Sequence, residues 1–162
     1  MKKARRNKQT ELMRAMVEQG FSRKAWHGPN LRGSIRGVTF REAARRPGPG
    51  RHNIWEIVVH AAYWKYVVRK RILPGQMSGF PINGRNWFRR PDVLSEKSWK
   101  HDIALLNRMH RLLLECISEL GDGDLKKPGR GRNQTWTLLW GIAAHDVYHA
   151  GQIQLIKRLL GL

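Results

Sequence analysis

The stretch that decides the expected fold is TWTLLWGIAAHDVYHAGQIQLIKRLL, residues 135–160. Apolar side chains recur in it at steps of three and four residues, which is the spacing of one face of an α-helix. His145 and His149 occupy two successive positions of that face. We therefore predict an amphipathic helix from about Thr135 to Leu160 that turns two imidazoles towards the interior of the protein. The apolar face consists of Leu138, Ile142, His145, His149, Ile153, Ile156 and Leu160.

Three other stretches of the chain show the same helical spacing. Asn53 and Glu56 are spaced as a helix cap at the start of the second stretch, and Gly121 follows the third as a stop signal. No stretch alternates apolar and polar residues over the length of a half-buried strand. Together with residues 135–160, these helices predict an all-α protein built as a four-helix bundle. The three helices are expected from about Thr10 to Trp26, from Asn53 to the Pro74-Gly75 pair, and from Ser95 or Ser98 to Leu120. For the first of them, a bend or an end at Gly20 is the alternative.

The connection between the second and third expected helices, Leu73–Leu94, is long and rich in glycine and proline. A long connection permits a crossover between parallel neighbours, whereas short connections join antiparallel ones. The expected fold is therefore a four-helix bundle with a long crossover between helices two and three. Phe80, Trp87 and Phe88 lie in this connection. Two interpretations are open for them, a lid over one end of the bundle or a hydrophobic plug of that end.

The composition is that of a strongly basic globular chain. Lysine and arginine number 31 against 12 acidic residues, which gives a formal net charge of +19, and 14 of the basic residues lie within residues 1–51. The apolar content of 41% excludes a disordered chain, and 162 residues suit a single domain with residues 1–9 as a basic tail. The single cysteine, Cys116, excludes an intramolecular disulfide and is expected to pack as a small buried hydrophobe. No apolar run approaches the ~18 residues of a membrane helix, so we expect a cytoplasmic protein with no membrane partner.

Three histidines have the placement of metal ligands. Residues four apart on a helix point the same way, so the imidazoles of His145 and His149 can reach one ion. His60 borders the apolar face of the second helix and supplies a third nitrogen. Three protein ligands leave one coordination position open, which is typical of catalytic zinc sites; the alternative is that hydrogen bonds within the core satisfy these side chains. The histidines for which we expect no metal role are His27, His52, His101 and His110.

The spacing of His145 and His149 also occurs in the His-Glu-x-x-His motif of zinc proteases. In that motif the glutamate is the general base of the reaction. Asp146 stands at the equivalent position here, and its side chain is shorter. We therefore exclude a protease of this type.

Three segments carry a resemblance to a known family. They are residues 25–29 (AWHGP), 52–60 (HNIWEIVVH) and 141–153 (GIAAHDVYHAGQI), of which the last is the most specific. On these residues the chain resembles the DinB/YfiT-like superfamily of bacterial four-helix-bundle metalloproteins, from about Ala25 to Leu160. The resemblance implies a metal triad of one histidine from the second helix and two from the last, which here are His60, His145 and His149. The density of basic residues departs from the family.

The resemblance also implies a chemistry. Characterised members of the superfamily use low-molecular-weight thiols, as thiol S-transferases and as a thiol-dependent isomerase, with a divalent metal that is often zinc or nickel. A thiol at the open metal position loses its proton near neutral pH, and the thiolate is the nucleophile. Gln152 and Tyr63, each three residues past a predicted ligand, either orient a ligand or substrate or pack in the second layer. The sequence supplies no general base, and the resemblance implies a homodimer.

Two other functions are compatible with the sequence. One is a bundle that binds a metal or a ligand without catalysis. The other is nucleic-acid binding, indicated by the basic arm Lys2–Lys8 and by the segment KKPGRGR at residues 126–132, which resembles a minor-groove hook. A net charge of +19 by itself predicts only salt-sensitive binding without sequence preference.

Overall fold

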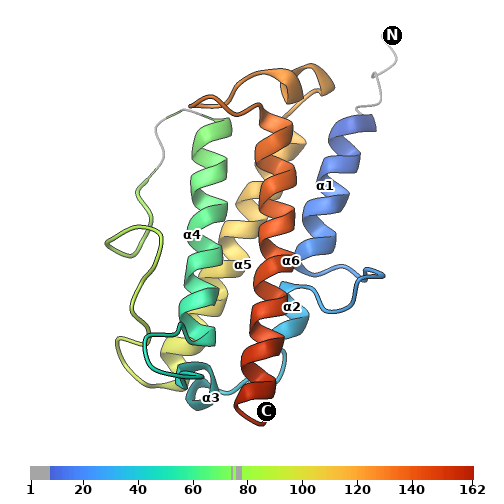
Figure 1. Cartoon of the computed structure of the whole chain (residues 1–162). Coiled ribbons are helices and arrows are strands. Elements are labelled where there is room, and N and C mark those ends of the chain that lie inside the picture. The colour runs from blue at the N-terminus through green and yellow to red at the C-terminus, as the bar shows by residue number, and fades with distance from the viewer. Residues whose placement is uncertain (1–7, 74, 76–77) are drawn as a thin grey trace.

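Four long helices form the frame of the protein (Figure 1). The structure is a computed structural model, and it describes residues 8–73, 75 and 78–162. Within these residues it contains no β-strand, so the predicted all-α bundle is confirmed. No helix of this part of the chain has the length and the apolar character that a membrane span requires. The long helices are α1 (Lys8–Phe21), α4 (Ile54–Ile72), α5 (Glu96–Ser118) and α6 (Thr135–Leu159), and the short ones are α2 (Leu31–Ser34), α3 (Phe40–Ala44) and the 3-10 helix η1 (Asp122–Lys126).

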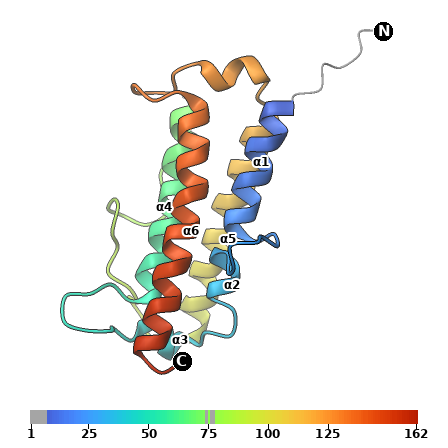
Figure 2. The same cartoon turned by 45° about the vertical axis from the view of Figure 1, so that its right-hand side comes forward.

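The long helices run in two parallel pairs. In Figures 1 and 2, α4 and α5 both rise from the end of the bundle where the C-terminus lies, whereas α1 and α6 both descend towards it. Helix α4 packs against α5 and α6, and α1 packs against α6. The connection between α4 and α5 therefore returns the chain to the end from which α4 started. This arrangement confirms the predicted long crossover between helices two and three.

The crossover runs along the side of α4, as Figure 1 shows. Phe88 is buried and its ring centroid lies 5.4 Å from that of Tyr63, while Phe80 lies 5.7 Å from Tyr66 in the same way. Both interpretations of these aromatic residues placed them at an end of the bundle, and both are wrong. The reason is the length of α4, because the chain must travel along the whole helix to reach its starting end.

Polar side chains start the helices where the sequence predicts. The side chain of Asn53 accepts a hydrogen bond from the backbone N–H of Glu56 at 2.8 Å. Ser95 accepts one from Ser98 at 3.1 Å, so α5 begins at Glu96. Each bond satisfies one of the N–H groups that a helix leaves unpaired in its first turn.

The first helix differs from its prediction at both ends. It begins at Lys8 and so includes the last two residues of the expected basic tail, while residues 1–7 lie outside the described part of the chain. It ends at Phe21 and not at Trp26, which is 97% exposed. Nearly all of residues 22–29 are exposed, so no packing supports a longer helix.

The core consists mainly of two clusters of apolar side chains. One cluster of buried side chains surrounds Trp55 of α4 and Trp99 of α5, and another surrounds Leu113 of α5 and Leu139 of α6. Cys116 belongs to the second cluster as the predicted small hydrophobe, and burial raises the pKa of its thiol to about 11. Polar groups enter this interior where α4 faces α6, and the candidate site lies there.

Candidate metal centre

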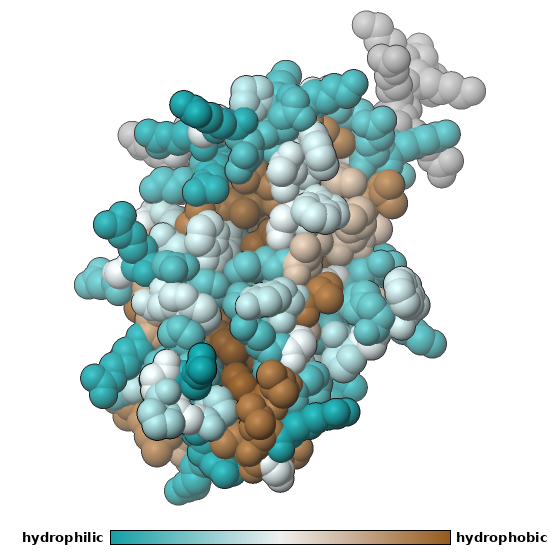
Figure 3. Space-filling view, in the orientation of Figure 1, coloured by the Kyte–Doolittle hydropathy of each residue, from teal (hydrophilic) through white to brown (hydrophobic). Residues whose placement is uncertain are grey.

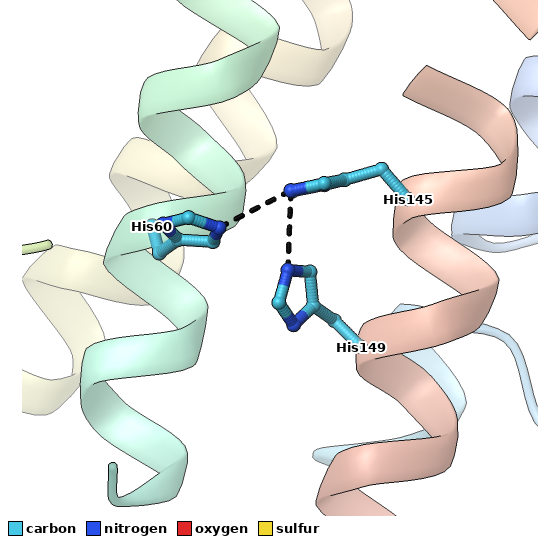
Figure 4. A group of neighbouring side chains, drawn as sticks. All are labelled: His60, His145 and His149. Atoms are coloured by element: carbon cyan, nitrogen blue, oxygen red, sulfur yellow. Dashed lines mark hydrogen bonds between the residues drawn. The ribbon is translucent and has the colours of Figure 1, made fainter. Parts of the chain in front are cut away.

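Three histidines meet between α4 and α6 (Figure 4). His60 comes from α4, and His145 and His149 lie one turn apart on α6. The Nε2 atom of His145 lies 3.2 Å from Nε2 of His60 and 3.1 Å from Nε2 of His149. The ligand atoms of the three side chains all lie within 4.8 Å of one another. The structure thus brings together the three residues that the sequence singles out.

The two separations from Nε2 of His145 fit a single divalent cation. Two nitrogens that each bind zinc at ~2.0–2.1 Å in a tetrahedral site lie roughly 3.3 Å apart. The separations of 3.2 and 3.1 Å are close to that value. Three imidazoles fill three positions of such a site, and the fourth remains for a small molecule.

Hydrogen bonds to the outer ring nitrogens orient two of the three imidazoles. Nδ1 of His60 lies 2.8 Å from the backbone oxygen of Asn86, and Nδ1 of His149 lies 2.7 Å from Oε1 of Gln152. Both oxygens can only accept, so each Nδ1 carries the proton and donates it. A neutral imidazole protonated on Nδ1 has a free lone pair on Nε2. Two lone pairs therefore point at Nε2 of His145, and such outer-shell hydrogen bonds are typical of metal-binding histidines.

The surroundings keep the three imidazoles neutral. Burial, followed by the nearby His149 and His60, lowers the pKa of His145 to about 3. Burial and the nearby His60 lower the pKa of His149 to about 4, although the hydrogen bond to Gln152 opposes the shift. Burial also lowers the pKa of His60. Neutral imidazoles have lone pairs available for a metal. A cation between the three rings would accept one lone pair from each of them.

Comparison with protein families identifies the chain. Residues 23–153 match the family model of the DinB superfamily. The chain belongs to the DinB superfamily. The match contains all three histidines and begins after α1, and the superfamily is metal-binding. The resemblance seen in the sequence is therefore confirmed, whereas no curated protein and no solved structure matches the chain significantly.

An indole ring covers one side of His60 in this DinB superfamily protein. Trp87 stacks on His60 with ring centroids 3.8 Å apart and planes inclined by 10°, and it also stacks on His52 at 3.6 Å. The indole N–H of Trp64 on α4 donates to Oδ1 of Asn86 at 3.0 Å. Since Asn86 and Trp87 both belong to the crossover, the crossover supplies a wall of the site and a hydrogen bond to one ligand.

Nothing in the sequence motifs indicates that Asn86 and Trp87 belong to the site. Asn86 has a φ of 68°, a left-handed conformation that asparagine tolerates better than most residues. In this conformation its backbone oxygen reaches His60 and its side chain reaches Trp64. The sequence feature that could have predicted a turn at Asn86 is the turn-forming composition of residues 83–86, NGRN.

Of the two residues expected beside the ligands, one contacts them. Gln152 accepts a hydrogen bond from His149 and donates through Nε2 to the hydroxyl of Tyr148 at 2.9 Å. Tyr148, which the sequence analysis did not single out, is 63% exposed and lies on the solvent side of the centre. Tyr63 instead packs against the crossover, with its ring centroid 5.4 Å from that of Phe80.

The other histidines lie outside the triad, as expected. His110 is buried in the core, and His27 and His101 are exposed. His52 has a closer relation to the centre than the sequence indicates, because it stacks on Trp87.

A buried ion pair shares α6 with the two histidines of that helix. Lys65 of α4 donates a hydrogen bond to Asp146 of α6, and neither side chain has exposed surface. Burial lowers the pKa of Lys65 and raises the pKa of Asp146, while the opposite charge of each partner counters the shift. Gly20 of α1 makes room beside the pair, because a Cβ there would lie 2.8 Å from the backbone oxygen of Ala143 and 3.5 Å from Cβ of Asp146. The aspartate that stands in the protease-like motif is thus engaged by a lysine in the core.

Proposed function

We propose that this protein binds a divalent cation, zinc or nickel, through His60, His145 and His149, and that it transfers a low-molecular-weight thiol to a small electrophile. The observation that carries the proposal is the convergence of three neutral imidazoles on one point. No acidic side chain among the described residues belongs to this group. A neutral ligand set leaves the charge of a dication uncompensated, and this favours an anion such as a thiolate in the open position.

When bound, the cation would lower the pKa of a thiol in the open position, so that the thiolate forms near neutral pH. The chain supplies the surroundings for the reaction. Trp87 excludes water from the side of His60 on which it stacks. The hydroxyl of Tyr148 accepts from Gln152 and so keeps its own proton for a hydrogen bond to the electrophile. Sulfur then bonds to carbon, the leaving group departs with its electron pair, and the thiol proton passes to solvent.

A paired assay tests the proposal. The protein is saturated with zinc or nickel, its metal content is measured, and small thiols are offered together with 1-chloro-2,4-dinitrobenzene, whose chloride the thiolate displaces. We expect one metal ion per chain and a transfer rate that falls to background with a chelator or in His149→Ala. His101→Ala changes an exposed histidine outside the triad and is expected to match the wild type. A wild type without stoichiometric metal under metal-replete conditions would contradict the site itself.

The same assay separates catalysis from binding. Stoichiometric metal without chelator-sensitive transfer, over a range of thiols and electrophiles, would identify a metal-binding bundle that lacks this activity. Three imidazoles suit zinc, nickel, copper and iron alike. Elemental analysis of the protein purified from its natural host therefore decides the metal.

Nucleic-acid binding is a weaker candidate. The segment at residues 126–132 is not a free arm, because the backbone N–H of Arg130 donates to the backbone oxygen of Arg71 at 2.6 Å. A Cβ on Gly129 would lie 2.8 Å from the same oxygen, so the segment is held against the end of α4. The basic arm Lys2–Lys8 lies outside the described residues except for Lys8. In filter binding we expect the affinity seen at low salt to vanish at physiological salt, and a retained, sequence-dependent affinity would reverse this ranking.

We also propose that a second copy of the chain covers an exposed apolar face of α6. From Thr135 to Ile156 the helix carries one formally charged residue, Asp146, and this residue is buried. Figure 3 shows apolar side chains at the surface along the lower half of this helix. A chain with a net charge of +19 repels its own copies, so contact between two copies is least costly across an uncharged surface. The face, called here the α6 face, consists of Trp136, Trp140, Val147, Leu155 and Leu159, each at least 36% exposed.

Sedimentation velocity over a range of protein concentrations tests the α6 face. We expect a dimer for the wild type and a monomer for Leu155→Lys, because a buried lysine at the interface is costly. Leu94→Lys places the same charge on an exposed leucine outside the face and is expected to leave the dimer intact. A wild type that is monomeric at all concentrations would contradict the proposal.

A further inference from the structure

A cavity of about 920 Å³ lies outside the metal centre, between the segment that contains α2 and α3 and the start of α5. Its lining comes from residues 22–41 and 96–103, so α4 and α6, which hold the three histidines, contribute nothing to it. Cavities of roughly 300–1,000 Å³ are the usual size of small-molecule sites. The proposed thiol chemistry makes no use of this space.

The rim of the cavity is strongly basic. Its cationic residues are Arg32, Arg36, Arg41 and Lys100. The acidic residue of the lining, Glu96, pairs with Nζ of Lys100 at 2.6 Å. Among the residues that the structure describes, no carboxylate forms an ion pair with Arg32, Arg36 or Arg41. The rim therefore carries three arginine charges without an anionic partner from the chain.

Two of these arginines form the core of the rim. Arg32 is half-buried in α2, and Arg36 follows four residues later. Burial, followed by the positive charge of Arg36, lowers the pKa of Arg32, as expected for two cations that line one cavity. An oxyanion between them would relieve the repulsion of the two charges, because each guanidinium can donate two parallel N–H bonds to phosphate or carboxylate oxygens.

The floor of the cavity is apolar. Val38 and Trp99 are buried beneath it, and Phe40 and Ile103 are half-buried in its wall. The indole N–H of Trp99 donates to the backbone oxygen of Val38 at 3.0 Å, so this polar group is already satisfied. The cavity therefore combines a cationic rim with an apolar floor.

We propose that this cavity binds an organic phosphate or carboxylate whose acidic group pairs with Arg32 and Arg36 and whose ring or aliphatic body covers Phe40 and Ile103. An inorganic anion engages the rim alone, and a neutral ring engages the floor alone. The expected ligand carries both parts in one molecule. The site does not depend on the metal centre, because the two share no lining residue.

Calorimetric titration of the full chain at physiological salt tests the site. The probes are 1-naphthyl phosphate, its two parts inorganic phosphate and 1-naphthol, and 1-naphthoate as the carboxylate counterpart. A chelator is present throughout, so that no metal at the histidines can bind the phosphate. We expect the joined molecules to bind at least about tenfold more tightly than either part. Equal binding of inorganic phosphate and 1-naphthyl phosphate would overturn the proposal, and the tighter of the two joined probes identifies the acidic group.

Matched arginine variants separate this site from the general charge of the protein. Arg36 is exposed, so Arg36→Gln removes a proposed ligand contact and leaves the core intact. We expect its affinity for 1-naphthyl phosphate to fall about tenfold, as for the loss of one charged hydrogen-bonded partner. Arg108→Gln removes the same charge from an exposed position of α5 outside the cavity and is expected to bind like the wild type. An equal loss of affinity in both variants would show that only net charge matters and would refute the site.

Discussion

Two polar clusters lie between α4 and α6, and they differ in charge. One consists of neutral histidines, and the other is a pair of opposite charges. His60, His145 and His149 are all neutral, and Nε2 of His145 lies close to Nε2 of each of the other two. Lys65 and Asp146 carry opposite charges and neutralise each other. The charges of the ion pair balance within the chain, although Oδ1 of Asp146 has no hydrogen-bond partner, whereas the three histidines bring nitrogen atoms together without any charge. This difference indicates that the histidine cluster, and not the ion pair, is suited to bind a cation from solution.

The two clusters share a single turn of α6. Asp146 follows His145 directly, so its side chain leaves the helix about 100° further round. On that side it meets Lys65 of α4, in the space that Gly20 of α1 leaves open. One turn of helix thus carries a charge-balanced pair on one side and two neutral imidazoles that face His60 on the other.

The largest effect is expected from separating the partners of the ion pair. Lys65→Met or Asp146→Leu leaves one buried charge without its partner, and we expect the free energy of unfolding to fall by about 3–5 kcal/mol. The double variant Lys65→Met/Asp146→Leu is expected to recover most of this loss. Denaturant unfolding measures all three. Lys100→Met, which breaks an exposed pair with Glu96, is the control and is expected to change little. A double variant as unstable as the single ones would show that the pair is not self-contained.

Metal binding is expected to complete the histidine cluster. At a free zinc concentration of one hundred times Kd, the wild type gains about 2.7 kcal/mol of stability. His145→Ala loses this gain because it removes the central nitrogen, and exposed His101→Ala keeps it. Unfolding with and without zinc measures the difference. Zinc that stabilises His145→Ala as strongly as the wild type would show that the histidine cluster does not bind the metal.

A smaller effect is expected from the hydrogen bond that orients His149. Gln152→Ala removes the acceptor for Nδ1, and we expect zinc affinity to fall by about 10- to 100-fold. Gln154→Ala, two residues further along α6, is the matched control. Competition with a chromophoric chelator gives both affinities. Unchanged affinity in Gln152→Ala would show that the packing of His149 alone orients its ring.

The smallest effect for one step of its experiment, a single pH unit, concerns a histidine outside the triad, and it accumulates as the pH falls. Burial, with a contribution from Lys65, lowers the pKa of His110 to about 3, whereas an unfolded histidine titrates near ~6.5. Below pH ~6.5 the unfolded chain binds a proton that the folded chain does not, so stability falls by up to ~1.4 kcal/mol per pH unit towards pH 3. In metal-free protein His110→Phe keeps the stacking on Phe21 and removes this contribution, so its stability is expected to fall less steeply with acid. Identical slopes in unfolding measured at pH 7, 6, 5 and 4 would show that His110 is not kept neutral.

The ligands of the candidate centre are predictable because they lie on regular helices. The four-residue spacing of His145 and His149 and the position of His60 beside an apolar face follow from helical periodicity alone. The helix caps at Asn53 and Ser95 are equally local. Gly20 indicated that the first helix could end before Trp26, but its end at Phe21 depends on packing that stops beyond that residue.

The residues that surround the ligands were not predictable, because they lie far from the ligands along the chain. Asn86 and Trp87 lie in an irregular connection whose path depends on where α5 begins in space. Nothing in the sequence distinguishes Lys65 from the other basic residues of the chain. Its burial against Asp146 depends on how α4 packs on α6.

By itself the sequence determined four amphipathic helices, the capped start of α4 and the sides of α4 and α6 on which the three histidines lie. These properties depend on the spacing of residues within one helix, and that spacing is visible in the chain. Only the tertiary structure decided that Trp87 covers His60, that Lys65 neutralises Asp146, and that Arg32 and Arg36 line one cavity with residues of α5. Such contacts join segments that lie far apart in sequence, so they exist only once the helices have packed.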